Sequence, residues 1–181
     1  VAMLRMHHAG LIRLPPPERG NGNGNTRPEL TAVSDPQQPL CARVDTIGEI
    51  TLRVVRTPKD SALWSELIQR YHYLGYTPLP GAQLRYLIFS PSKLLGALGF
   101  GAAAWLAAPR DRFIDWNTAQ REANLHLVIN NARFLILPWI TVKNLASTTL
   151  AIASKRLPSD WKQHYGYQPV LLETFVECTR F

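Results

Sequence analysis

From about residue 48 onward, hydrophobic residues recur at the spacings of strands and helices, which predicts a folded domain containing both. Glu49 to Val55 and Gln83 to Phe89 alternate as strands do, and Ser90 to Lys93 provides a turn into a partner strand. Pro58 suits the first position of a helix. In chain order, the expected elements are strands at 49–55, 83–89, 94–100, 132–137 and 169–176. The expected helices are one that begins at Pro58 and ends near residues 71–75, and two more at 116–130 and 145–157.

Residues 130–176 carry the most informative part of this pattern, which predicts a strand, a tight turn, an amphipathic helix and a further strand. A strand that enters a helix through small residues places backbone N–H groups where an anion can bind. The whole order predicts an α+β fold, with a mixed central sheet and flanking helices. In topology alone, residues 48–176 resemble the Gcn5-related N-acetyltransferase fold, which implies a cofactor pyrophosphate on the helix after the fourth strand.

Three segments are expected along the chain. Residues 1–25 are interpreted as the remnant of an N-terminal helical module, of the helix-turn-helix kind or a solvated helix, followed by a Pro run and a Gly/Asn run. Residues 26–47 form a Pro-rich linker. Residues 48–181 form the acyltransferase-like domain, which is expected to be incomplete at its C-terminal end.

The formal net charge of +7 over 181 residues favours a polyanionic partner such as nucleic acid, although a basic protein without such a partner is the alternative. Cys41 and Cys178 lie far apart and in no CxxC pair, so reduced thiols and a cytoplasmic location are expected. The longest uncharged run, Leu94 to Ala108, is shorter than the roughly 20 residues of a membrane span. We therefore expect no membrane partner.

A dense set of polar residues follows the hairpin, and Asp115 is expected to cap the helix that bears part of it. Arginine suits phosphate contacts and asparagine suits base edges. An exposed helix face with ordinary caps is the alternative. The predicted nucleic-acid-binding residues are Arg110, Arg121, Asn124, Asn130, Asn131 and Arg133, with Tyr73 and Trp116 as stacking side chains.

Tyr73 belongs to an aromatic cluster, Tyr71 to Tyr76, at the end of the first helix, where packing is the alternative to stacking on bases. His72 in the same cluster is a candidate base without a partner fixed by spacing. No catalytic residue is assigned. A metal site is not expected, because the adjacent His7 and His8 and the two cysteines lack companion ligands at recognised spacing.

A second candidate site is the turn before the helix at 145–157. In the acetyltransferase fold this turn carries Arg/Gln-x-x-Gly-x-Gly/Ala, whereas Ile140 to Ser147 contains no glycine here. The candidate anion or cofactor residues are Lys143, Asn144, Ala146 and Ser147. The alternative is a structural turn with Asn144 as the N-cap, and no cofactor is assigned.

Several segments resemble the DruA protein family of the Druantia anti-phage systems, whose members also occur beside transposase-like genes. They are Arg5 to Pro17, Tyr71 to Tyr76, Ala119 to Leu125, and Asn130 to Trp139 continuing to Asn144–Ser147, with Arg110 to Ser147 as the most specific block. The resemblance implies a bacterial cytoplasmic protein of phage defence or of a mobile element that acts on or near DNA. It also implies further chain on both sides of this sequence.

The leading hypothesis is therefore a DNA-interacting component of an anti-phage or transposase-associated system, with DNA and other defence proteins as partners. The alternatives are an acyl- or aminoacyl-transferase-like enzyme that uses the strand–turn–helix anion site, and a non-catalytic scaffold subunit of a defence complex. Whether any reaction is catalysed is left open.

Overall fold

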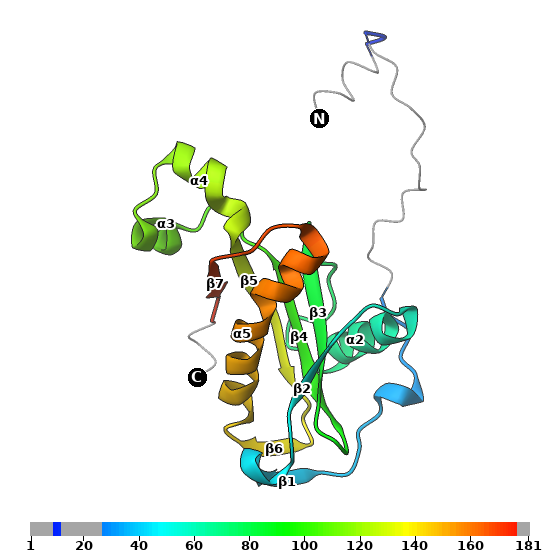
Figure 1. Ribbon diagram of the computed structural model, residues 1–181. Coiled ribbons are helices and arrows are strands. Elements are labelled where there is room, and N and C mark those ends of the chain that lie inside the picture. Colours follow the sequence, from blue (N-terminus) through cyan, green and yellow to red (C-terminus); the bar gives the residue numbers. More distant parts are fainter. Residues whose placement is uncertain (1–8, 12–26, 177–181) are drawn as a thin grey trace.

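The computed structural model describes residues 9–11 and 27–176 (Figure 1). Almost all of the expected N-terminal helix, the Pro and Gly/Asn runs after it, and Cys178 lie outside these ranges. The described chain is an α+β domain with a mixed sheet and helices on both of its faces, as the sequence pattern predicts.

The main sheet has five strands in the order β2-β3-β4-β5-β7. Neighbouring strands are antiparallel from β2 to β5, and β5 and β7 are parallel. A separate parallel pair joins β1 to β6. The strands are β1 Leu40–Arg43, β2 Thr51–Val54, β3 Gln83–Phe89, β4 Leu94–Ala102, β5 Val128–Ile136, β6 Ile140–Lys143 and β7 Leu171–Thr174.

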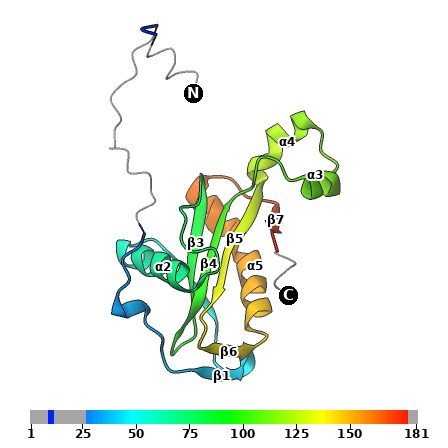
Figure 2. The same ribbon diagram turned by 180° about the vertical axis from the view of Figure 1, so that it is seen from behind.

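Two long helices cover opposite faces of the main sheet (Figures 1 and 2). Helix α2, Pro58–Tyr71, begins as the sequence predicts, because Pro58 takes the first turn and the Thr57 side chain accepts a hydrogen bond from the Asp60 N–H. Helix α5, Leu145–Tyr165, is longer than the expected 145–157 and continues through Pro158 until Gly166, whose positive φ ends it.

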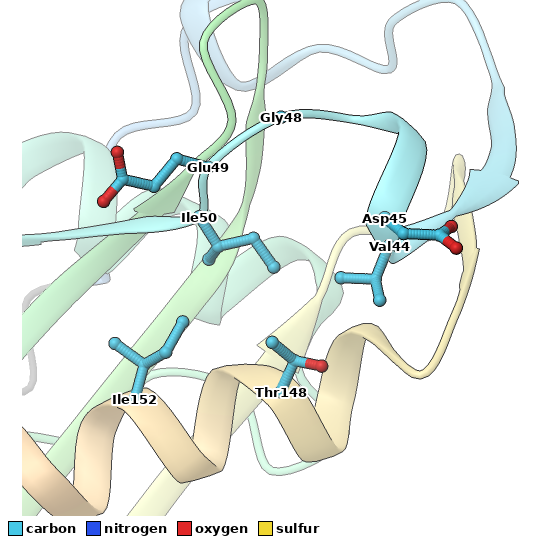
Figure 3. Close-up of a pocket in the computed structure, with 7 residues that line it drawn as sticks. All are labelled: Val44, Asp45, Gly48, Glu49, Ile50, Thr148 and Ile152. Carbon is cyan, nitrogen blue, oxygen red and sulfur yellow. The ribbon is translucent and has the colours of Figure 1, made fainter.

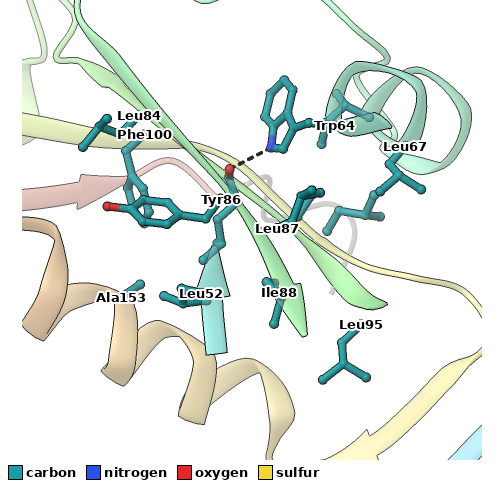
Figure 4. Packing of buried hydrophobic residues seen from close by; sticks show 14 of the residues in the cluster. Leu52, Trp64, Leu67, Leu84, Tyr86, Leu87, Ile88, Leu95, Phe100 and Ala153 are labelled. Carbon is teal, nitrogen blue, oxygen red and sulfur yellow. Dashed lines mark hydrogen bonds between the residues drawn. The ribbon is translucent and has the colours of Figure 1, made fainter. Parts of the chain in front are cut away.

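The core fills both layers between sheet and helices (Figure 4). On the α5 side, Tyr86 and Phe100 meet edge to face with ring centroids 5.9 Å apart. On the α2 side, Trp64 and Leu67 are almost fully buried, and the Trp64 indole N–H donates to the Leu98 carbonyl at 2.9 Å. That carbonyl adjoins a register shift between Gly99 and Phe100, where the β4–β5 ladder is irregular.

The single helix expected at 116–130 is wrong. Helix α3, Ala108–Ile114, ends before this span, which contains α4, Thr118–Asn124, the 3₁₀ turn η3, Leu125–Leu127, and the start of β5. Asp115 does not begin a helix, since its φ of 61° ends α3. Asn117 caps α4 instead, through a reciprocal pair of hydrogen bonds with Gln120.

Residues 27–47, expected as a linker, contain β1 and the 3₁₀ turns η1, Ala32–Ser34, and η2, Val44–Thr46. Ser34 is buried, and its carbonyl accepts a hydrogen bond from the Tyr71 hydroxyl at 2.7 Å. Strand β1 pairs with β6 beside the start of α5. This segment therefore packs on the domain and shapes the surroundings of the α5 N-terminus.

Candidate functional site

Two arginines lie in one row across the centre of the main sheet. Arg85 on β3 pairs in register with Gly99 on β4, and Gly99 pairs with Arg133 on β5. Residues paired in this way share a face, and two inter-strand steps place the two arginine Cα atoms about 10 Å apart. The face is the one that α2 covers, since Trp64 of α2 lies against Gly99. We call Arg85 and Arg133 the sheet-face arginine pair.

Gly99 allows this arrangement because it has no side chain. A Cβ there would lie 2.9 Å from Trp64 Cζ2 and 3.2 Å from Arg133 Cβ, so a larger residue would displace the indole. The Trp64 ring therefore lies directly on the backbone of β4. The Arg85 guanidinium lies over this ring, 5.3 Å from its centroid, and is held in place by a cation–π contact.

The sheet-face arginine pair has no carboxylate partner among the described residues. Arg133 donates from Nη1 to the Ala132 carbonyl at 2.7 Å, whereas its buried Nε has no hydrogen-bond partner within the described chain. Burial lowers the pKa of both guanidinium groups, although both remain cations. A partly desolvated cation without a counter-charge is costly, so this geometry is suited to binding an anion.

Aromatic side chains at the end of α2 border Arg133. The rings of His72 and Tyr73 stack with centroids 4.7 Å apart and an interplanar angle of 23°. His72 Nδ1 accepts a hydrogen bond from the Leu74 N–H at 3.2 Å, which fixes the ring in its neutral, Nε2-protonated form. Burial, and secondarily the charge of Arg133, lower the pKa of His72 to about 4. His72 is therefore a neutral support for Tyr73 at physiological pH.

The lowered pKa of His72 predicts a pH-dependent stability. The unfolded chain takes up a proton near pH 6.5, whereas the folded chain resists it until about pH 4. The stabilising contribution is therefore present above pH 6.5 and is lost as the pH falls towards 4, by up to about 3 kcal/mol. We expect the free energy of unfolding of wild type to fall more steeply over this range than that of His72→Asn, measured in urea. Parallel curves for the two proteins would contradict the assignment.

A second charged group joins the helices α3 and α4, here called the arm, to β7. Arg110 lies 2.9 Å from Asp111 and 3.3 Å from Glu173, and Arg121 lies 3.6 Å from Asp111. Only 4% of the Arg110 side chain is exposed. We call these four residues the ionic cluster. The cluster balances the charges of Arg110 and Arg121, so neither is comparable to the sheet-face arginine pair as a ready anion site.

Asn130 and Asn131 of β5 point to opposite faces of the sheet. Ile129 lines a crevice with Ser154 and Leu157 of α5, so Asn131 shares the α5 face and Asn130 lies on the face of Arg133. Both side-chain carbonyl oxygens are buried without a hydrogen-bond partner among the described residues. The structure thus places Asn130, and not Asn131, beside the sheet-face arginine pair.

The other predicted nucleic-acid contacts lie away from this row. Asn124 donates from its amide to the Gln120 carbonyl inside α4. Trp116 is partly buried at the corner between α3 and α4, where its backbone N–H donates to the Asp111 carbonyl. These hydrogen bonds stabilise the local structure of the arm.

The predicted anion loop lies at the β1–β6 end of the domain, opposite the arm (Figure 1). Asn144 precedes α5 with a φ of 65°, and its side chain makes no capping hydrogen bond, unlike the expected N-cap. Ser147 donates to the Asn144 carbonyl, Lys143 pairs in register with Arg43, and Ala146 follows in the first turn.

A shallow pocket borders the early turns of α5 (Figure 3). Its centre is apolar, with Ile50 and Ile152, and Asp45 and Glu49 lie at its edge with their carboxylates pointing outward. Acidic side chains disfavour a pyrophosphate at this end of α5. Together with the absence of glycine from the turn, they weaken the case for a cofactor here.

Arg133 and Tyr73 were among the candidate residues predicted from the sequence, whereas Arg85 was not. The signal was present, because Arg85 occupies the same face of a strand as the apolar residues Leu87 and Phe89. A charge on such a face calls for a partner or a ligand. Its link to Arg133 depends on the register of three strands, which the local pattern does not contain.

Within the described ranges, no group of three or more His, Cys, Asp or Glu side chains is arranged to hold a metal ion. No helix of the described chain is long and apolar enough to cross a membrane.

Comparison with known proteins gives one family. Searches of curated proteins and of solved structures found no match to this chain. The family described as Druantia protein DruA matches residues 7–181, which is nearly the whole sequence and includes every element of the domain. The chain therefore belongs to the DruA family, and this membership indicates a component of a Druantia anti-phage defence system.

Proposed function

We propose that this chain is a DNA-contacting component of Druantia defence and that the sheet-face arginine pair holds phosphates of the DNA backbone. One observation carries the proposal: Arg85 and Arg133 are partly buried, lie on one face and have no carboxylate partner in the described chain. Phosphate would supply the missing counter-charge, and the planar guanidinium group binds it with two hydrogen bonds. The net charge of +7 adds a long-range attraction for DNA.

The scaffold that we propose for this role is acetyltransferase-like in topology. Support comes from the four antiparallel strands followed by a parallel β5–α5–β7 unit. A transferase activity receives less support than DNA binding, because the turn before α5 lacks glycine and acidic residues line the neighbouring pocket. We therefore expect no binding of coenzyme A at millimolar concentration, and saturable binding would favour the transferase instead.

The test of the proposed function is fluorescence anisotropy of labelled DNA over a salt series. Arg85→Gln and Arg133→Gln should each weaken binding about tenfold, in keeping with the loss of one charge-assisted contact. Each should also reduce the slope of log affinity against log salt by roughly 0.7–0.9. The folded state should lose little stability, because each change removes a partly buried charge that has no carboxylate partner.

Arg43→Gln is the matched control. It removes the same charge from an exposed pair with Asp45, in which more than half of each side chain is accessible. Its affinity and salt slope should stay close to those of wild type. An equal loss of affinity in all three variants would show that binding depends on net charge and not on the sheet-face arginine pair. An absence of DNA binding at low salt would overturn the proposal.

A further inference from the structure

We infer that the DNA bound at this site is single-stranded and that its bases stack on Tyr73 and Trp105. The inference rests on the proposed function and adds the class of substrate. The face that carries the sheet-face arginine pair continues along β5 towards the arm. Asn130 lies on the same face of β5 as Arg133, and its register partner on β7 is Glu173. Glu173 binds Arg110, so the arm is attached directly beside this face.

Exposed aromatic rings border both ends of this path. Tyr73, beside Arg133, has 52% of its surface exposed, and Trp105, at the base of the arm, has 55% exposed. Large aromatic side chains are usually more buried than this in a folded domain. Figure 2 shows the arm projecting from the end of the sheet near β5 and β7, away from α2, so its base and the end of α2 bracket this face.

Each ring is supported from behind. The His72 ring stacks on Tyr73 at 4.7 Å, and the Arg121 guanidinium lies 5.6 Å from the centroid of the Trp105 ring. Arg121 is itself held by Asp111 of the ionic cluster. A ring fixed in this way loses little further freedom when a base stacks on it. This gives the ionic cluster a role in positioning Trp105, without a direct contact to DNA.

These features suit single-stranded DNA better than duplex. In a duplex the base faces are stacked on one another, so the surface presents only phosphates and base edges. A single strand presents its base faces, and stacking of a base on an aromatic side chain contributes about 1–3 kcal/mol. Cations and aromatic rings along one path are the combination that single-strand binding requires.

The experiment compares a labelled single strand with a duplex of the same length and sequence at one salt concentration. The single strand should bind at least tenfold more tightly. Trp105→Ala and Tyr73→Ala should each weaken single-strand binding about tenfold and leave duplex binding unchanged. Leu106→Ala is the matched control for Trp105, since Leu106 is adjacent, apolar and 65% exposed but cannot stack on a base. Its affinity should equal that of wild type.

A conservative variant separates stacking from general damage. Trp105→Phe retains an aromatic face and should bind the single strand nearly as well as wild type. It should also lose the quenching of tryptophan fluorescence that a stacked base causes in wild type. Equal affinity for both DNA forms, or a single-strand preference that survives both alanine variants, would overturn the inference while leaving the proposed function in place. No binding of either form at low salt would instead remove the proposed function.

Discussion

Gly96→Ala should destabilise this protein by about 3 kcal/mol or more, at the upper end of the range for overpacked sites. A Cβ at residue 96 would overlap the carbonyl oxygen of Leu135 and would lie 3.1 Å from its carbonyl carbon and 3.2 Å from Ile88 Cδ1. The first two atoms belong to the backbone of β5 and cannot rotate away. Relief therefore requires β4 and β5 to separate at the centre of the sheet. Urea denaturation followed by circular dichroism would measure the loss.

Gly101→Ala is the control on the same strand. A Cβ there would lie 3.8–4.0 Å from Leu79 and Ala82, which is ordinary van der Waals contact, so the change adds a methyl group without a clash. We expect the free energy of unfolding to change by about 0.5 kcal/mol or less, with a small gain from the reduced entropy of the unfolded chain. If Gly101→Ala lowered the free energy of unfolding as much as Gly96→Ala, the close approach of β5 would not be the reason that β4 requires glycine.

The regular part of the fold was predictable from local pattern. The strand expected at 83–89 coincides with β3, because its alternation and the turn at Ser90–Lys93 are contained in adjacent residues. Helix α2 was predictable for the same reason, since Pro58 and the apolar residues of one face specify its start and its orientation. Both elements depend on interactions a few residues apart.

The arm and the sheet-face arginine pair depend on longer-range interactions. A continuous helix at 116–130 conflicts with the strand pairing of Val128 and Ile129, and tertiary packing decided the outcome. Arg85 and Arg133 come to lie in one row only when β3 and β5 both pair with β4, with Gly99 between the two arginines. Glu173 reaches Arg110 only after α5 returns the chain to the sheet. The spacing of residues within a single strand or helix does not predict which of these residues lie near one another.

Arg110→Met should cost about 3–5 kcal/mol, because it leaves the partly buried carboxylates of Asp111 and Glu173 short of a counter-charge. The loss should be concentrated in the arm. Among the described residues of α3 and α4, Arg110 is the only buried one, so the arm has little apolar packing to hold it against β7. Hydrogen exchange should therefore accelerate in α3 and α4 well before it does in β3 and β4.

A second change separates the charge effect from simple loss of packing. Arg110→Met combined with Glu173→Leu removes the uncompensated carboxylate and leaves Asp111 paired with Arg121. Replacing a buried ion pair by apolar residues of similar volume is often neutral, so stability should recover by several kcal/mol relative to Arg110→Met alone. If the double variant is no more stable than Arg110→Met, packing by the arginine side chain and not its charge holds the arm. Single-strand binding should recover with stability, because the arm would again place Trp105 beside β5 and β7.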